Sequence, residues 1–445
     1  MLIITAILIG LALIVVFTSI LKYNTFLSIF IVSLIIALIT LPLQDVVPTI
    51  LTGFGNTMKS IGLIIIFGII LGLILDKTHA TKSIAHAILK LTGKKNAGLA
   101  VHSTGFITGI PIFCDSGFIV LQGINKSLVE STGKPMAFMA SVLAAGLYSV
   151  HCLIPPHPGA TAAAGIMSAN IGQLIMIGLP VAAVAALSGF LWVKFITRKD
   201  LNTLPINNSD KKNQNEAIEL PSAFRSLLPI VVPVLLLSGR SAFLLLAPGD
   251  QGALTKIISF LGEPIIALII GILLAVSLYK KVNSKELNEL FDLSIEKAGT
   301  ILAITAAGGI FGTVIKATGI GEVAGVYLAE TGLGLFVPFL IASFLKTAQG
   351  SSTVAIMTTA SIISPMLASL KLDGSYGIVL ATLAMGAGSM FISHTNDSYF
   401  WVITKFSDLE VKSTLRVWTT TTAVMGIFAF AAVWVLFAVI KISHF

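Results

Sequence analysis

The chain has 445 residues, of which 56% are hydrophobic and only 11% charged, and its mean hydropathy is +0.97. A soluble domain carries about 25% charged residues, so this composition excludes a soluble fold and predicts an integral membrane protein. The net charge of +8 does not indicate nucleic-acid binding, because the Lys and Arg residues fall in short segments between apolar runs, where such residues set orientation in a membrane. Cys114 and Cys152 both lie in apolar runs and predict no disulfide.

Apolar runs recur along the whole chain, which predicts one all-α polytopic membrane unit without a separate soluble domain. A helix needs about 20 apolar residues to cross the hydrocarbon. Full spans are expected at Leu2–Leu21, Thr25–Leu43, Lys59–Leu75, Pro135–Ser168, Ile171–Ile196, Ser226–Ala247, Ile257–Tyr279, Ala298–Ile315, Ser375–Thr404 and Thr414–Ile440.

Two further segments, Ala97–Leu121 and Leu335–Leu370, are interrupted by Gly, Pro and polar residues. Non-helical backbone at membrane depth is tolerated only where it is buried in protein or lines a water-filled cavity. Each segment is therefore predicted to be a re-entrant helical hairpin. The spans at 135–168 and 375–404 contain similar polar breaks and are predicted to be broken helices.

Basic residues indicate which segments face the cytoplasm. The segments 77–96 and 197–225 are rich in Lys and Arg, whereas 44–57 contains neither, so the first two are expected in the cytoplasm. The chain then divides into 1–196, a cytoplasmic linker at 197–225, and 226–445.

Each half holds five spans and one hairpin. Because five is odd, the second half enters the membrane inverted relative to the first. Weak local sequence similarity between the two halves agrees with a duplication, although chance similarity between apolar segments remains an alternative. The matched pairs, each separated by roughly 240 residues, are Lys77 with Lys316, Thr92 with Thr331, Asp115 with Ser352 and His151 with His394.

Polar residues at the hairpin tips are the first candidates for a binding site, because polar groups inside a membrane are costly and commonly functional. In the first hairpin they are Gly109, Pro111, Asp115 and Ser116. Asp115 is the leading proton or cation carrier, with a static helix-capping carboxylate as the alternative. In the second hairpin, a half-helix that opens with hydroxyls and amides suits a carboxylate; the candidates are Gln349, Gly350, Ser351, Ser352 and Thr353.

The broken spans supply the remaining candidates. His157 stands among prolines in the first break, and the second break contains His394, Thr395, Asn396 and Asp397. Substrate contacts are expected from the histidines, Thr395 and Asn396, and Asp397 is the second candidate for coupling to a proton or ion. No histidine pair has the spacing of a zinc site, and no phosphate-binding loop is present, so no metal or other cofactor is expected.

The runs around Asp115, LIPPHPGA at 153–160, KTAQGSSTVA at 346–355 and GAGSMFISHTNDSYFW at 386–401 resemble the gluconate permease (GntP) family of secondary transporters. The resemblance covers nearly the whole chain. It implies proton-coupled uptake of gluconate or a related sugar acid across a bacterial inner membrane, by a homodimer with elevator-type motion. Cys114 departs from an aromatic residue that some relatives have, which leaves the substrate open.

The expected function is therefore a symporter for a small anionic substrate in a lipid bilayer, and not an enzyme. Within transport, uptake of D-serine or another small acid, and sodium in place of the proton, remain alternatives. A membrane enzyme with His394 and Asp397 as an acid/base pair is a more distant alternative, because that reading gives no role to paired tips and inverted halves.

Overall fold

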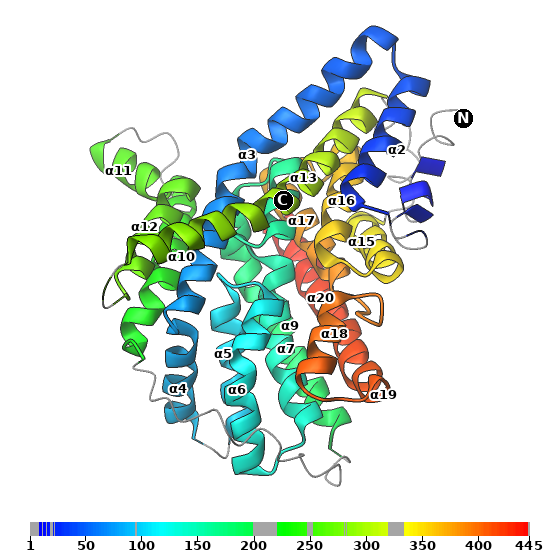
Figure 1. Cartoon of the computed structure of the whole chain (residues 1–445). Helices are drawn as coiled ribbons and strands as arrows, with labels where there is room; N and C mark the ends of the chain where they lie inside the picture. Colours follow the sequence, from blue (N-terminus) through cyan, green and yellow to red (C-terminus); the bar gives the residue numbers. More distant parts are fainter. Residues whose placement is uncertain are drawn as a thin grey trace.

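The computed structural model describes residues 23–93, 96–198, 220–246, 252–279, 283–318 and 333–443, together with residue 281 and a few positions before residue 23. Over these residues the protein is helical and contains no β-strand (Figure 1). Up to the linker, the helices are α2 (Thr25–Thr40), α3 (Leu43–Lys77), α4 (Ala80–Thr92), α5 (Ala97–Gly109), α6 (Cys114–Thr132), α7 (Met136–Leu153), α8 (Pro158–Met167) and α9 (Ile171–Ile196).

The helices after the linker begin at Ala223. They are α10 (Ala223–Leu246), α11 (Ala253–Leu261), α12 (Pro264–Val276), α13 (Ser284–Ala317), α15 (Phe336–Gln349), α16 (Ser352–Ile363), η3 (Ser364–Met366), α17 (Ser375–Ser389), α18 (Ser398–Phe406), α19 (Val411–Thr414), the π-helical turn η4 (Leu415–Thr419) and α20 (Thr420–Ser443).

Polar side chains begin several of these helices by accepting a hydrogen bond from an amide of the first turn, which would otherwise lack a partner. Asn24 accepts from Leu27 N at 3.2 Å, and Asn170 accepts from Gln173 N at 2.9 Å. Asn283 does the same at the start of α13. Apolar sequence therefore supplies the body of each helix, and short polar residues define where it starts.

Six helical segments in the described part of the chain are long and apolar enough to cross a membrane. A seventh is possible if α11 and α12, which are bent by 64° at their junction, form one broken span. The six are Leu43–Lys77, Met136–Met167, Ile171–Ile196, Ala223–Leu244, Ser284–Ala317 and Val411–Ile440. This arrangement is that of a polytopic membrane protein, with fewer full-length spans than the ten expected from hydropathy.

The difference has identifiable causes. The expected span Leu2–Leu21 lies largely outside the described residues. The expected span Thr25–Leu43 becomes α2, whose 16 residues fall short of a full crossing. The expected span Ser375–Thr404 is divided between α17 and α18. Most of the expected linker also lies outside the described residues. The same holds for Thr331, one of the residues matched between the two halves.

Two helices are much longer than expected: α3 has 35 residues and α13 has 34 (Figure 1). The segment 44–57, which separates two expected spans, forms the first part of α3, and the charged residues between Lys285 and Lys297 form the start of α13. Glycines in these helices serve close packing: a Cβ on Gly53 of α3 would lie 2.7 Å from Ile310 Cα of α13.

Helix packing repeats between the two halves. α3 packs along α13, α2 packs on α13 while α12 packs on α3, and α5 packs on α7 as α15 packs on α17. Likewise α7 packs on α9 as α17 packs on α20, and α9 contacts α20. Helices with equivalent positions in the two halves thus make equivalent contacts.

The two predicted hairpin segments each contain a helix break. α5 ends at Gly109 and α6 begins at Cys114, while α15 ends at Gln349 and α16 begins at Ser352. We call these breaks the first tip and the second tip. α6 continues to Thr132, beyond the expected end at Leu121. That both segments enter and leave the membrane on one side stays a prediction.

Candidate functional site

The second tip is a sharp turn built on Gly350. This residue ends α15 with φ of +83°, a conformation that costs a glycine little and other residues more. Ser351 then starts α16, and its hydroxyl accepts from Val354 N at 3.3 Å. A Cβ on Gly350 would collide with the carbonyl oxygen of Asn396, so the second tip is pressed against the break between α17 and α18.

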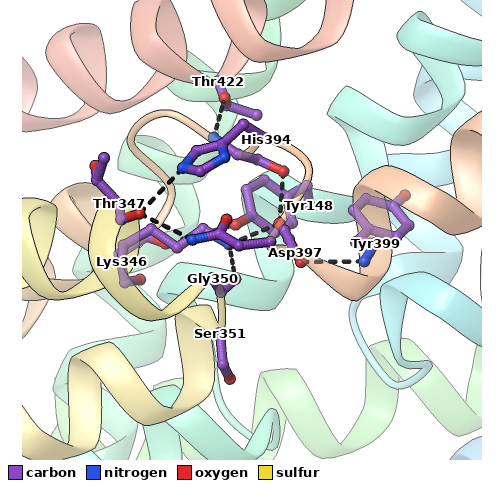
Figure 2. A network of polar contacts seen from close by, with 12 residues as sticks. Tyr148, Lys346, Thr347, Gly350, Ser351, His394, Asp397, Tyr399 and Thr422 are labelled. Carbon is purple, nitrogen blue, oxygen red and sulfur yellow. Dashed lines mark hydrogen bonds and ion pairs between the residues drawn. The ribbon is translucent and has the colours of Figure 1, made fainter. Parts of the chain in front are cut away.

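Hydrogen bonds from this break hold the second tip in place (Figure 2). His394 Nε2 donates to Thr347 O at 3.0 Å, and Asn396 Nδ2 donates to the same oxygen at 2.9 Å. Asn396 Nδ2 also reaches Ala348 O at 3.3 Å. The last turn of α15 is thereby tied to the break between α17 and α18 through its exposed carbonyl groups.

An ion pair lies beneath these contacts. Lys346 Nζ lies 2.6 Å from Asp397 Oδ2, and the two side chains are 0% and 6% exposed. The ammonium also donates to Gly350 O, and it lies 5.8 Å from the centre of the Tyr148 ring. Removing one partner of a buried pair leaves an uncompensated charge and destabilises a protein by about 3–5 kcal/mol. The pair therefore fixes both residues while intact.

Asp397 has further donors (Figure 2). Its Oδ2 accepts from Ser393 Oγ at 2.5 Å, and its Oδ1 accepts from Tyr399 N at 3.0 Å, which caps the start of α18. Trp418 Nε1 donates to Ser393 Oγ at 2.9 Å. Thus Asp397 lies where the sequence predicted a site residue, as a carboxylate with three partners.

Lys346, Tyr148 and Ser393 are not among the site residues predicted from the sequence. Lys346 is the only charged residue of α15, and its side chain has no exposed surface. A charged residue at membrane depth is by itself a signal for a functional position, and its partner, 51 residues away, could not be identified from spacing.

The first tip is held by His157. Its Nε2 donates to Gly109 O at 2.6 Å, and the side chain is only 2% exposed. His157 also packs against His151 with ring centres 4.8 Å apart, and both rings contact Phe113. A histidine in the break between α7 and α8 therefore satisfies the carbonyl group that the end of α5 leaves open.

The other residues of the first tip have different surroundings. Pro111 is buried, and its carbonyl lies against Gly72 of α3, where a Cβ would be 2.7 Å away. Ser116 is half-buried. Asp115 is also half-buried, and its Oδ1 is a buried oxygen without a hydrogen-bond partner among the described residues. Both polar atoms of the Gln349 side chain at the second tip are buried and unpartnered in the same sense.

The two tips meet at a shared centre. Asp115 lies within electrostatic range of Asp397 and Lys346. Ser352 starts α16 two residues after Gly350, the residue whose carbonyl group accepts from Lys346.

The centre has an aromatic wall. Tyr148 stacks on Tyr399 at 5.5 Å, and both rings contact Trp418. We use "central cluster" for Asp115, Tyr148, Lys346, Ser352, Ser393 and Asp397.

Three of the predicted site residues lie at the edge of the central cluster. Thr353 meets the start of α8, where a Cβ on Gly159 would be 3.2 Å from Thr353 Cα. Thr395 and Asn396 are exposed, and the Thr395 carbonyl accepts from Trp401 Nε1 at 2.8 Å. Over the described chain, no group of three His, Cys, Asp or Glu side chains is placed to hold a metal ion.

Comparison with known proteins places this arrangement in a family. Residues 1–440 match the family described as GntP family permease. The Gnt-II system L-idonate transporter of Escherichia coli K12 is 30% identical over 436 residues, which cover 95% of this chain and 97% of the relative. A gluconate permease of Pseudomonas aeruginosa is 29% identical, covering 87% of this chain and 86% of the relative.

Solved structures agree on the fold. The crystal structure of the YdaH transporter of Alcanivorax borkumensis superposes with a TM-score of 0.62 over 89% of this chain and 90% of that one, at 15% sequence identity. The relatives are named permeases or transporters, which points to transport and not to an enzyme. The match over nearly the full length shows that this chain belongs to the GntP permease family.

Proposed function

We propose that this protein imports gluconate or a closely related sugar acid across the bacterial inner membrane together with a proton. The observation that carries the coupling is the buried Oδ1 of Asp115 at the first tip, which has no hydrogen-bond partner among the residues that the structure describes. Two unit charges 4 Å apart repel by about 4 kcal/mol near a protein surface and by more in a drier site. An anionic substrate beside ionised Asp115 is therefore unfavourable until a proton neutralises the carboxylate.

Asp115 is a better proton carrier than Asp397. Asp397 already accepts from Lys346, Ser393 and the backbone of Tyr399. Protonation would weaken those contacts, whereas Asp115 Oδ1 has no contact of this kind to lose. Asp397 then serves as a fixed negative charge that holds Lys346.

The relatives suggest the substrate class. Their names include gluconate and L-idonate, and both compounds join one carboxylate to a chain bearing several hydroxyls. Backbone amides and hydroxyls at the start of α16 match that chemistry, because a helix N-terminus favours an anion. Gln349, with two unpartnered polar atoms, adds a donor and an acceptor for substrate hydroxyls.

Alternating access is the mechanism that we propose, with 1–196 and 226–445 as inverted repeats. Equivalent packing of α2 on α13 and α12 on α3, and of α5 on α7 and α15 on α17, supports this division. The tips and broken helices would move together as an elevator against a scaffold of α2, α3, α10, α12 and α13 in a homodimer.

Counterflow into proteoliposomes tests the function directly. Vesicles preloaded with unlabelled gluconate should take up labelled gluconate, and external L-idonate should compete more strongly than D-serine. Removing sodium should leave the exchange unchanged. Competition by D-serine alone, or a strict need for sodium, would contradict the proposed substrate or ion, and chemical conversion of gluconate in detergent would contradict a transporter.

A further inference from the structure

The central cluster contains one cationic side chain in the described part of the protein, Lys346, and it contains two carboxylates, Asp115 and Asp397. An anionic substrate entering between the tips needs a positive partner. The question is whether Lys346 can supply it while paired with Asp397.

The ammonium group of Lys346 can donate a further hydrogen bond. An ammonium group has three N–H donors. One is directed to Asp397 Oδ2 and one to Gly350 O. The remaining side of the ammonium faces the Tyr148 ring, 5.8 Å from its centre.

The start of α16 lies close to this ammonium, because Lys346 donates to Gly350 O and α16 begins two residues later, at Ser352. Backbone amides in this first turn have no partner inside the helix. A carboxylate placed between Lys346 and Ser352 would thus meet an ammonium, a hydroxyl and the positive end of a helix.

Asp397 has hydrogen-bond partners besides Lys346. Ser393 Oγ and Tyr399 N hold its two oxygens independently, and Trp418 fixes Ser393. Lys346 can therefore share its charge with a ligand without leaving Asp397 unsatisfied.

We propose that Lys346, with the hydroxyl of Ser352, binds the carboxylate of the substrate, and that Asp397 is the fixed counter-ion that holds this ammonium in the empty protein. This assignment rests on the proposed function and names the residue that selects acids over uncharged polyols.

Variants that separate binding from structure test the assignment. Lys346→Met leaves Asp397 buried without its cation. A loss of uptake in this variant alone would therefore not distinguish a role of Lys346 in substrate binding from a structural role. The double variant Lys346→Met/Asp397→Asn removes both charges, which restores charge balance, and a melting temperature in detergent verifies that it folds. We expect the double variant to bind D-gluconate about 10- to 100-fold more weakly than wild type, as the loss of a charge-assisted hydrogen bond implies. Its preference for D-gluconate over uncharged D-gluconamide should disappear.

A second measurement uses Asp397→Asn alone. That variant leaves the ammonium without its counter-charge, so D-gluconate should raise its melting temperature by more than it raises that of wild type. Recovery of wild-type gluconate affinity in the double variant, or equal stabilisation of Asp397→Asn and wild type, would show that Lys346 only ties the second tip to its neighbour and would overturn the assignment. If wild type itself bound no sugar acid, the proposed function would fail first, and this assignment with it.

Discussion

The proposed coupling of substrate transport to a proton depends on single residues. Asp115 and Asp397 are both carboxylates close to one lysine, but their hydrogen bonding differs. Asp397 caps α18 and pairs with Lys346, whereas Asp115 Oδ1 is buried and has no partner in the described part of the chain. Unequal surroundings of this kind are how two carboxylates in one site acquire different roles.

Asp115→Asn should abolish accumulation driven by a pH gradient while leaving counterflow of gluconate measurable. The amide cannot exchange a proton, but it removes the charge that opposes the substrate. Uptake of labelled gluconate into proteoliposomes, with and without an imposed gradient, measures both activities.

The matched control is Asp408→Asn. Asp408 is an exposed carboxylate whose partner is Lys126 at 3.0 Å, and exposed pairs contribute little. This variant should behave as wild type. Concentrative uptake by Asp115→Asn at the wild-type level would exclude Asp115 as the proton carrier.

Three of the six residues of the central cluster, Asp115, Ser352 and Asp397, were predicted from the sequence, because polar groups in apolar surroundings stand out. Tyr148, Lys346 and Ser393 were not. The sequence also predicted His157, which the structure places against the first tip. It could not show that His157 bonds to Gly109 or that Lys346 pairs with Asp397, since these contacts join segments whose approach is set by packing. The role of each residue in binding or coupling stays a prediction.

At the scale of elements, the second tip depends on one glycine. Gly350 has φ of +83°, and a Cβ there would strike Asn396 O. Gly133 also has positive φ, +66°, but its Cβ would enter open space. Comparing the two separates backbone strain from collision with the break between α17 and α18.

Gly350→Ala should therefore reduce gluconate uptake strongly and lower the melting temperature. Gly133→Ala should retain uptake, because it meets only the left-handed backbone penalty of about 1–2 kcal/mol. Uptake assays and thermal unfolding of the two purified variants test this contrast. Equal behaviour of the two variants would mean that the contact between the second tip and Asn396 is unimportant.

The long helices α3 and α13 make a second prediction at this scale. A Cβ on Gly309 would collide with Thr57 Oγ1 and lie 2.9 Å from Gly53 O, whereas Gly299 on the same helix has open space. Gly309→Ala should destabilise the protein by about 1–3 kcal/mol through overpacking, and Gly299→Ala should not. If both alanine variants melted at the wild-type temperature in detergent, close packing of α3 on α13 would be disproved.

These same helices mark where sequence reasoning failed. The segment 44–57 lies outside the expected spans, and the expected span Ala298–Ile315 leaves out the charged start of α13, because charge is a poor signal for a membrane span. Their helical state follows from packing, since small residues let two helix backbones approach closely. Hydropathy measures transfer into lipid and does not register such contacts, so helix existence was predicted better than helix length.

For the whole molecule, the apolar composition was sufficient to predict an all-helical membrane protein. The number of full crossings was not predictable from it, because α2, α11 and α17 are apolar without being long enough to span alone. The proposed division into inverted repeats is supported by equivalent packing in the two halves and by the position of the two tips at one centre. It predicts that both halves contribute to one transport site.

In the proposed function, a sugar acid crosses the membrane together with a proton. Proteoliposomes containing the purified protein, with an acidic exterior, a neutral interior and no sodium, should accumulate labelled gluconate above its external concentration. Collapsing the pH gradient with a protonophore should return the internal concentration to the external one. Accumulation that ignored the pH gradient, or equilibration without accumulation, would contradict a proton-coupled sugar-acid transporter.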